Sequence, residues 1–190
     1  MITEDYYLVI DLEATCDEGH RIPRERTEII EIGAVLVDAN SLHIVDELQT
    51  FVKPVVHPVL TAFCTQLTSI TQSQVAKAPT FPLAVERLRA FIGETSAKFC
   101  SWGDYDKNQF AREAERNQVT LPFTRGHLNL KQAFSERLGE ARRYGLGQAL
   151  RRVGLRFEGT AHRGIDDARN IARLLPLILG REARRAQVPR

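Results

Sequence analysis

Cysteines and long apolar runs are scarce in this sequence, and each scarcity argues against a class of protein. The 190 residues include three cysteines and one tryptophan. Cys16, Cys64 and Cys100 are odd in number and form no C-x-x-C pair, which argues against a disulfide framework or a zinc site. No stretch approaches the roughly 20 apolar residues of a membrane span, and the acidic start, residues 1–5, is unlike a signal peptide. We therefore expect reduced thiols and a cytoplasmic protein.

Length and composition predict one globular domain. A chain of 190 residues, 43% hydrophobic and 26% charged, is expected to bury roughly 70% of its unfolded surface. We assign this domain to residues 1–180 and a basic tail to residues 181–190. The net charge of +2 says little, but arginines concentrate in the last third of the chain. They fit either a polyanionic partner or solvated helix faces: Arg142, Arg143, Arg151, Arg152, Arg156, Arg163 and those of the tail.

Two acids end a strongly apolar strand near the start of the chain. The run Tyr6–Ile10 is apolar at successive positions, which predicts a strand buried on both faces. Side chains alternate along a strand, so Asp11 and Glu13 point to the same face. Two neighbouring carboxylates are tolerated if a divalent cation lies between them, and oxygen ligands favour Mg²⁺ or Mn²⁺. The alternative is that both acids are solvated at the strand end.

Further along, strands and helices alternate. Apolar residues at 29–37 and 42–52 predict an antiparallel hairpin, in which Glu31 needs a hydrogen-bonding partner. Spacing then predicts other elements in chain order: a helix at 81–92, a strand at 98–102, a helix at 107–117, a short strand at 127–130 and a helix at 164–179.

His162 and Asp167 lie where the last predicted helix begins. Gly164 separates them, which favours a histidine on the loop that leads into the helix. An imidazole with an ordinary pKa of about 6.5 is suited to take a proton from water near neutral pH. Alternatively, Asp166 or Asp167 caps the helix and His162 is a surface residue.

Three segments together resemble the DEDDh 3′-5′ exonuclease superfamily. They are Ile10–Thr15 (IDLEAT), Trp102–Asp106 (WGDYD) and His162–Asn170 (HRGIDDARN). The resemblance covers roughly residues 5–179 and is strongest to the branch that contains the histone-mRNA 3′ exoribonuclease. It implies an α/β fold of the ribonuclease H type, a mixed five-stranded sheet with three antiparallel strands first and helices on both faces.

The resemblance also implies the catalytic residues. Asp11, Glu13, Asp104 and Asp167 would hold two Mg²⁺ ions, with Mn²⁺ as a substitute, and His162 would be the general base. Asp106 competes with Asp104 for one position, and Asp166 with Asp167 for another. We favour Asp104 because it follows the predicted strand directly, and Asp167 because it lies five residues after the histidine.

The implied reaction releases nucleoside 5′-monophosphates from the 3′ end of single-stranded RNA or a short 3′ overhang. Ala14, Thr15 and Tyr105 are expected beside the terminal nucleotide. Phe63 or Trp102 would stack on a base, unless these two aromatic side chains belong to the core. The alternatives are a 3′-5′ DNA exonuclease and a regulatory binding protein built on the same fold.

Overall fold

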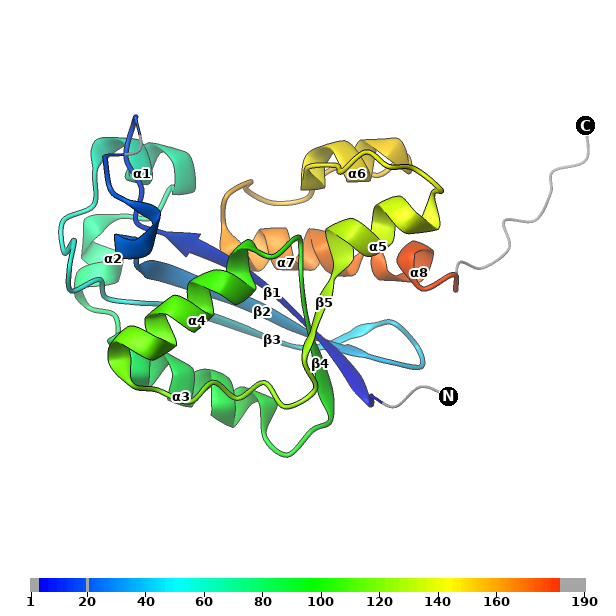
Figure 1. The fold of residues 1–190 in the computed structure, drawn as a ribbon, viewed down its shortest axis with the longest axis horizontal. Helices are drawn as coiled ribbons and strands as arrows, with labels where there is room; N and C mark the ends of the chain where they lie inside the picture. Colours follow the sequence, from blue (N-terminus) through cyan, green and yellow to red (C-terminus); the bar gives the residue numbers. More distant parts are fainter. Residues whose placement is uncertain (1–3, 20, 182–190) are drawn as a thin grey trace, which may run out of the picture.

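A mixed sheet of five strands forms the centre of the computed structural model, which describes residues 4–19 and 21–181 (Figure 1). Along the sheet the order is β3-β2-β1-β4-β5. The first three strands are antiparallel, whereas β4 and β5 run parallel to β1. This is the predicted five-stranded ribonuclease H-type topology. The strands are β1 (Tyr6–Ala14), β2 (Ile29–Asp38), β3 (Ile44–Phe51), β4 (Ala97–Ser101) and β5 (His127–Asn129).

Strand β1 is buried on both faces, as its apolar run predicts. Tyr7 and Val9 belong to the hydrophobic cluster on one face, and Leu8, Ile10 and Leu12 to the cluster on the other. Strand β4 pairs only with the first part of β1, from Tyr6 to Val9. The carboxyl end of β1, which carries Asp11 and Glu13, therefore extends beyond β4 while it remains paired with β2.

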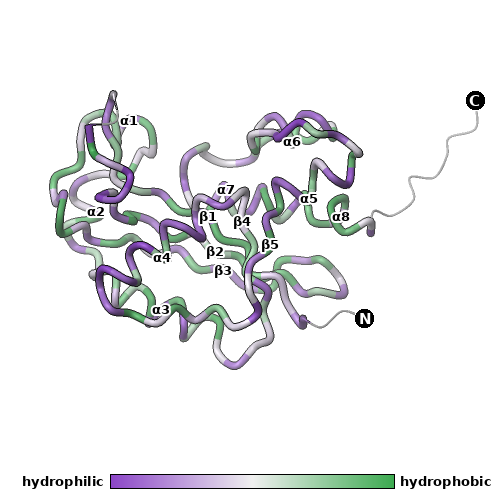
Figure 2. The backbone as a smooth tube through the Cα atoms, viewed as in Figure 1, coloured by the Kyte–Doolittle hydropathy of each residue, from purple (hydrophilic) through white to green (hydrophobic). Residues whose placement is uncertain are grey.

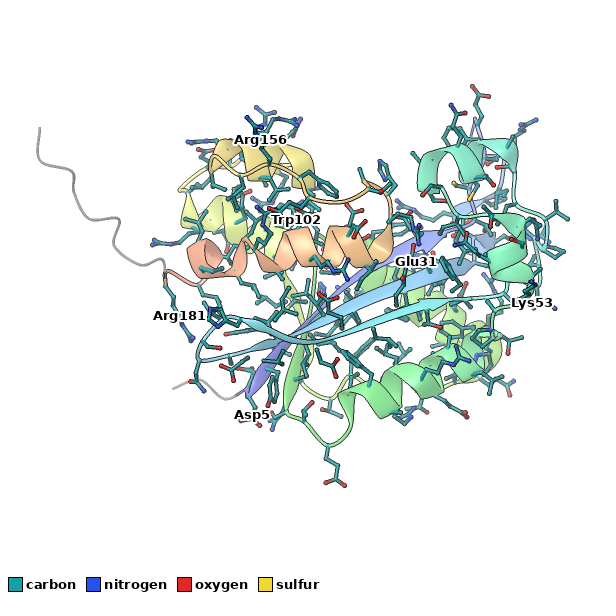
Figure 3. All side chains as sticks on the ribbon, turned by 180° about the vertical axis from the view of Figure 1, so that it is seen from behind. Asp5, Glu31, Lys53, Trp102, Arg156 and Arg181 are labelled. Carbon is teal, nitrogen blue, oxygen red and sulfur yellow. The ribbon has the colours of Figure 1, made fainter. Side chains whose placement is uncertain are left out.

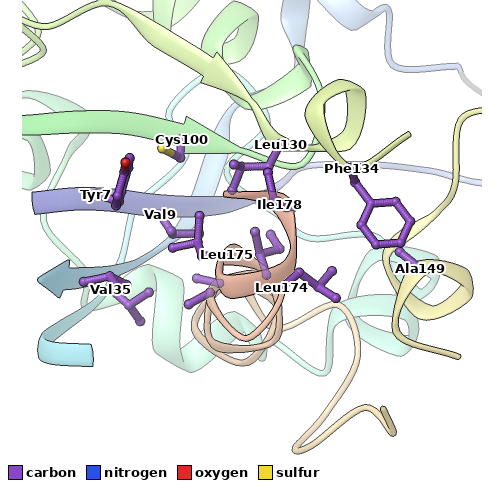
Figure 4. Close-up of a cluster of buried hydrophobic side chains, with 14 of the residues drawn as sticks. Tyr7, Val9, Val35, Cys100, Leu130, Phe134, Ala149, Leu174, Leu175 and Ile178 are labelled. Atoms are coloured by element: carbon purple, nitrogen blue, oxygen red, sulfur yellow. The ribbon is translucent and has the colours of Figure 1, made fainter. Parts of the chain in front are cut away.

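Helices cover both faces of the sheet. One face packs against α3 (Phe81–Ile92) and α4 (Tyr105–Asn117). The other face packs against a second helical layer, whose core is drawn in Figure 4. Figure 2 shows hydrophobic residues along the central strands and hydrophilic ones interspersed in α4 and α6. The second layer consists of α5 (Leu130–Arg137), α6 (Leu146–Arg152), α7 (Gly164–Ala172) and α8 (Leu175–Ile178).

Three short elements gather at the carboxyl end of β1. They are η1 (Arg24–Arg26), α1 (Ala62–Thr68) and α2 (Gln72–Ala76). Thr61 donates its hydroxyl hydrogen to the carbonyl oxygen of Cys16 at 2.7 Å, which ties the start of α1 to the chain just after β1. No helix in the described ranges is long and apolar enough to cross a membrane.

The predicted helix at 164–179 is interrupted. Helix α7 ends at Ala172 and α8 starts at Leu175, with Pro176 in its first turn. Proline cannot donate the backbone hydrogen bond needed inside a helix but is compatible with the first turn of a new one. The prediction of one continuous helix was therefore wrong at this point.

Two glycines set the position of α7 on the sheet. A Cβ atom on Gly33 of β2 would lie 2.0 Å from the carbonyl carbon of Gly164, and a Cβ atom on Gly164 would lie 2.8 Å from the carbonyl oxygen of Asp11. These distances are too short for any side chain. The first turn of α7 thus rests directly on the backbone of β1 and β2, which brings Asp167 to the acids of β1.

Candidate active site

Three of the predicted metal ligands meet at the carboxyl end of β1. One carboxylate oxygen from each of Asp11, Glu13 and Asp167 lies within 4.8 Å of the other two. Asp11 and Glu13 share a face of β1, and Asp167 comes from the first turn of α7. Glu13 is buried, and the other two are partly exposed. The structure therefore joins acids that are about 150 residues apart in sequence into one cluster.

Asp106 is the fourth acid beside this cluster. Its side chain is buried, and its Oδ1 accepts a hydrogen bond from the backbone N–H of Leu12 at 3.1 Å. The charge of Asp106 raises the pKa of Asp11 and of Glu13, as does the charge of Asp167. The carboxylate of Asp106, from α4, thus contacts β1 at Leu12, the residue between the two acids of the strand.

Asp104 lies away from these acids, so its predicted place among the metal ligands was wrong. Its carboxylate accepts hydrogen bonds from Lys107 and from Asn129, both at 2.9 Å, and its side chain is 51% exposed. The hydrogen bond from Lys107 lowers its pKa. Gly103 has a φ of +111° and α4 begins at Tyr105. The turn leaves Asp104 outside, and the first turn of the helix directs Asp106 toward β1.

Burial and neighbouring carboxylates raise the pKa values of all four acids. Burial is the largest cause for each of them. With the neighbouring charges and hydrogen bonds included, the pKa is raised to about 9 for Glu13, about 7 for Asp106 and about 6 for Asp167, and that of Asp11 lies well above its usual range. A cation offsets such repulsion, and an all-carboxylate donor set suits a hard divalent ion better than zinc. The residues therefore fit a divalent-metal centre.

Glu31 supports the cluster from β2. It lies opposite Glu13 in the strand register and is fully buried. Its carboxylate accepts hydrogen bonds from Arg163 Nε at 3.0 Å, from the N–H of Gly164 at 3.2 Å and from Gln49 at 2.6 Å. The expected structural hydrogen bonds are confirmed. Glu31 thereby holds the start of α7 against the sheet.

His162 lies on the loop before α7, as its position near Gly164 predicts. Its φ of 60° is in the left-handed region, and the residue is exposed. The backbone N–H of Arg163 donates to the carboxylate of Asp167 at 3.1 Å, and a backbone hydrogen bond from His162 also lowers the pKa of that acid. The loop thus wraps around Asp167 and presents the imidazole to solvent beside the cluster.

A pocket of about 590 Å³ opens next to the carboxyl end of β1. Of the predicted substrate-binding residues, Ala14, Thr15, Phe63 and Tyr105 line it. The Thr15 hydroxyl accepts a hydrogen bond from the N–H of Glu28 at 2.9 Å, which fixes its position. Phe63 and Tyr105 are 38% and 37% exposed. Two aromatic surfaces therefore face solvent close to the acids.

Trp102 does not reach this pocket. Its ring lies 5.7 Å from that of Phe134, and its indole N–H donates to the carbonyl oxygen of Tyr144 at 2.9 Å. Figure 3 shows it beneath the α6 layer, apart from Glu31 and the start of α7. The stacking role predicted for Trp102 was wrong, whereas the alternative assignment to the core is confirmed.

Leu67 and Arg24 also belong to the pocket wall. Leu67 lies one turn after Phe63 and is 39% exposed; the spacing of four indicates that the two side chains share a helix face, but does not tell whether that face belongs to the core or to a binding surface. Arg24 lies in the charged stretch after β1, with its guanidinium carbon 5.7 Å from the centre of the Tyr105 ring. No periodicity marks Arg24, so only the fold places it there.

Comparison with known proteins gives one consistent result. The exonuclease (RNase_T) family model matches residues 8–175. The 3′-5′ exoribonuclease 1 of Rattus norvegicus is 34% identical over 180 residues, covering 90% of this chain and 52% of the rat protein. The 3′-5′ exonuclease eri1 of Schizosaccharomyces pombe is 32% identical over 198 residues, covering 90% of this chain and 66% of the yeast protein. The chain thus spans about half to two thirds of the length of these relatives.

Among solved structures, the nuclease domain of 3′hExo, a DEDDh family member bound to rAMP, superimposes with a TM-score of 0.87. It is 30% identical, and the match covers 94% of each chain. The cell-death related nuclease CRN-4 superimposes with a TM-score of 0.82 at 25% identity, covering 93% of this chain and 64% of that one. The fold and the order of its elements are therefore those of these nucleases.

Proposed function

We propose, since the chain belongs to the exonuclease (RNase_T) family, that it is a metal-dependent 3′-5′ exonuclease. Its substrate would be single-stranded RNA or a 3′ overhang, hydrolysed to nucleoside 5′-monophosphates. The observation that carries this proposal is the cluster of three carboxylates at the end of β1, with a fourth, Asp106, hydrogen-bonded to the strand between two of them, beside a pocket with exposed aromatic side chains. The names of the relatives, 3′-5′ exoribonucleases, favour RNA over DNA.

Members of this family depend on divalent metals, and here Asp11, Glu13, Asp106 and Asp167 would hold two ions. We propose Mg²⁺, with Mn²⁺ as a substitute, because all four donors are carboxylates. Bound ions of this kind offset the negative charge that develops on the phosphate and on the departing oxygen. The raised pKa values of the four acids support this assignment, since each acid needs a nearby positive charge to remain ionised.

The remaining residues position the substrate and move a proton. The imidazole of His162 accepts a proton from the attacking water, and the backbone of the same loop orients Asp167. Phe63 and Tyr105 present ring surfaces to the terminal base. Ala14 and Thr15 bring the backbone after Glu13 against the terminal sugar. The pocket therefore holds the last nucleotide so that its 5′ phosphate lies at the acids.

The direct test is degradation of RNA labelled at the 5′ end, next to DNA of the same sequence, with Mg²⁺, Mn²⁺ or EDTA. We expect a ladder that shortens from the 3′ end, that is faster on RNA, and that is absent in EDTA. His162→Ala is expected to reduce the rate at least about 100-fold. If folded protein gives no ladder with either metal, the proposed function is wrong.

Three further expectations stay proposals. They are the domain at residues 1–180, the basic tail at residues 181–190 and the cytoplasmic location. Of the tail, residues 182–190 lie outside the described residues. Limited proteolysis and cell fractionation test these assignments.

A further inference from the structure

One segment of the second helical layer carries an unusual charge. Residues 141–157, which include α6, contain five arginines and no Asp, Glu, Lys or His. The whole chain, by comparison, has a net charge of only +2. We call this segment the arginine segment. Its arginines are Arg142, Arg143, Arg151, Arg152 and Arg156.

The segment is anchored by its apolar residues and exposes its charges. Ala149 and Leu150 of α6 are fully buried in the core. Arg152 forms an ion pair with Glu140 at 2.9 Å. The other four arginines are exposed, and within the described ranges none of them is within ion-pair distance of a carboxylate.

In contrast, the neighbouring arginines on and beside α7 form ion pairs. Arg163 pairs with Glu31, Arg169 with Glu47 and Asp166, and Arg173 with Glu158. These residues hold the fold together. The other four arginines of the arginine segment form no such ion pair; Arg142 lies over the Tyr144 ring, with its guanidinium carbon 4.9 Å from the ring centre.

The place of the segment connects it with the active site. Figures 1 and 3 show α1 and α6 on the same edge of the molecule, with the carboxyl end of β1 and the start of α7 between them. The chain runs from α6 through residues 153–163 directly to His162 and Asp167. The nucleotide pocket lies toward α1, because Phe63 and Leu67 of α1 line it.

We propose that the arginine segment binds the phosphates of the RNA chain upstream of its 3′-terminal nucleotide. This inference rests on the proposed function. Arginine binds phosphate oxygens through two N–H groups at once and keeps its charge at every physiological pH. Arg151 also suits the last turn of α6, where a cation interacts favourably with the helix dipole. That structural explanation does not apply to Arg142, Arg143 and Arg156, which lie outside the helix.

The test compares a long and a short substrate. The variant replaces Arg142, Arg151 and Arg156 by Gln, and the control is Arg125→Gln. Arg125 precedes β5, so it lies at the edge of the sheet opposite the carboxyl end of the parallel strand β1. Binding of a fluorescent single-stranded RNA 12-mer is measured by anisotropy in EDTA at several salt concentrations. Hydrolysis of a dinucleotide is measured with Mg²⁺.

We expect the triple variant to bind the 12-mer at least about tenfold more weakly. The slope of log binding constant against log salt concentration should become shallower by about 2, because each of the three lost phosphate contacts contributes about 0.7. Dinucleotide hydrolysis should be unchanged, and the control should match the wild type in both assays. Unchanged 12-mer binding by the triple variant, or equal weakening by the control, would overturn the inference. So would a parallel loss of dinucleotide hydrolysis, because the segment would then support the active site itself. Failure of the wild type to hydrolyse any substrate would instead refute the proposed function, and the binding data would still test the surface.

Discussion

Replacing Asp106 by Asn separates the structural assignment of the fourth acid from the one favoured by sequence. The amide oxygen of Asn can still accept the hydrogen bond from the N–H of Leu12, so the change removes mainly the charge. A unit charge ~4 Å from a cation is worth ~4 kcal/mol per cation charge at an effective dielectric constant of ~20. Loss of ~4 kcal/mol of transition-state stabilisation lowers the rate by ~10³-fold. We expect at least this loss in kcat/KM for Asp106→Asn.

Asp104→Asn is the matched control. Its carboxylate contacts Lys107, Asn129 and solvent, so we expect kcat/KM to change by less than about threefold, as for exposed ion pairs. The assay is the initial rate of RNA degradation over a range of Mg²⁺ concentrations. Equal losses in the two variants, or a loss in Asp104→Asn alone, would refute the reasoning.

The Asp106→Asn variant also tests a second, independent prediction, which concerns stability. Burial and neighbouring acids raise the pKa of Asp106 from 3.8 to about 7. The carboxyl therefore stabilises the metal-free fold fully below pH 3.8, and this contribution is lost as the pH rises through about 7. Asp106→Asn should therefore increase the free energy of unfolding in EDTA at pH 8, by on the order of 2 kcal/mol. Urea denaturation measures this. A catalytic loss accompanied by lower stability would instead indicate a damaged fold.

Three other substitutions test the fold and the pocket. Gly33→Ala should lower stability by about 3 kcal/mol or more and reduce activity, because the added Cβ atom collides with Gly164. Gly147→Ala is the control, since a Cβ atom there would meet only a flexible side-chain atom at 3.6 Å. Thermal unfolding compares the two variants. Glu113 is buried, with its pKa raised to about 8. It therefore stabilises the fold fully below its ordinary pKa of 4.5 and progressively less as the pH rises toward 8. Glu113→Gln should be more stable than the wild type at pH 9, by on the order of 3 kcal/mol. Urea denaturation should show a smaller stability difference between the two proteins at pH 5 than at pH 9, and an equal difference at both pH values would contradict this prediction. Phe63→Ala should raise KM about tenfold through lost base stacking, whereas the exposed Val59→Ala should not, and equal KM values in the two variants would contradict the pocket assignment.

Much of the fold follows from residue patterns. The apolar run of β1 and the hairpin of β2 and β3 are visible because burial on both faces leaves few polar positions. The break between α7 and α8 is not visible in this way, because the apolar spacing continues through Pro176. A proline is compatible with either a kinked helix or the start of a new one, and packing against the sheet decides between them.

In the candidate site, too, some residues could be predicted from the sequence and others depend on the fold. Asp11, Glu13 and Asp167 could be identified because strand alternation and motif spacing place them. Asp104 and Asp106 could not be separated, because the choice depends on the turn at Gly103 and on where α4 begins. Trp102 was misplaced for a related reason: residue type does not tell whether an aromatic ring faces a pocket or the core.

The central claim is hydrolysis from the 3′ end to 5′-monophosphates, and the fate of one phosphate tests it most directly. A single-stranded RNA carries a radioactive phosphate only in its last phosphodiester bond and is incubated with the protein and Mg²⁺. The account predicts that the label appears at once as a nucleoside 5′-monophosphate, and that EDTA prevents its release. Label released first in a nucleoside 3′-monophosphate or in a longer fragment would contradict the account.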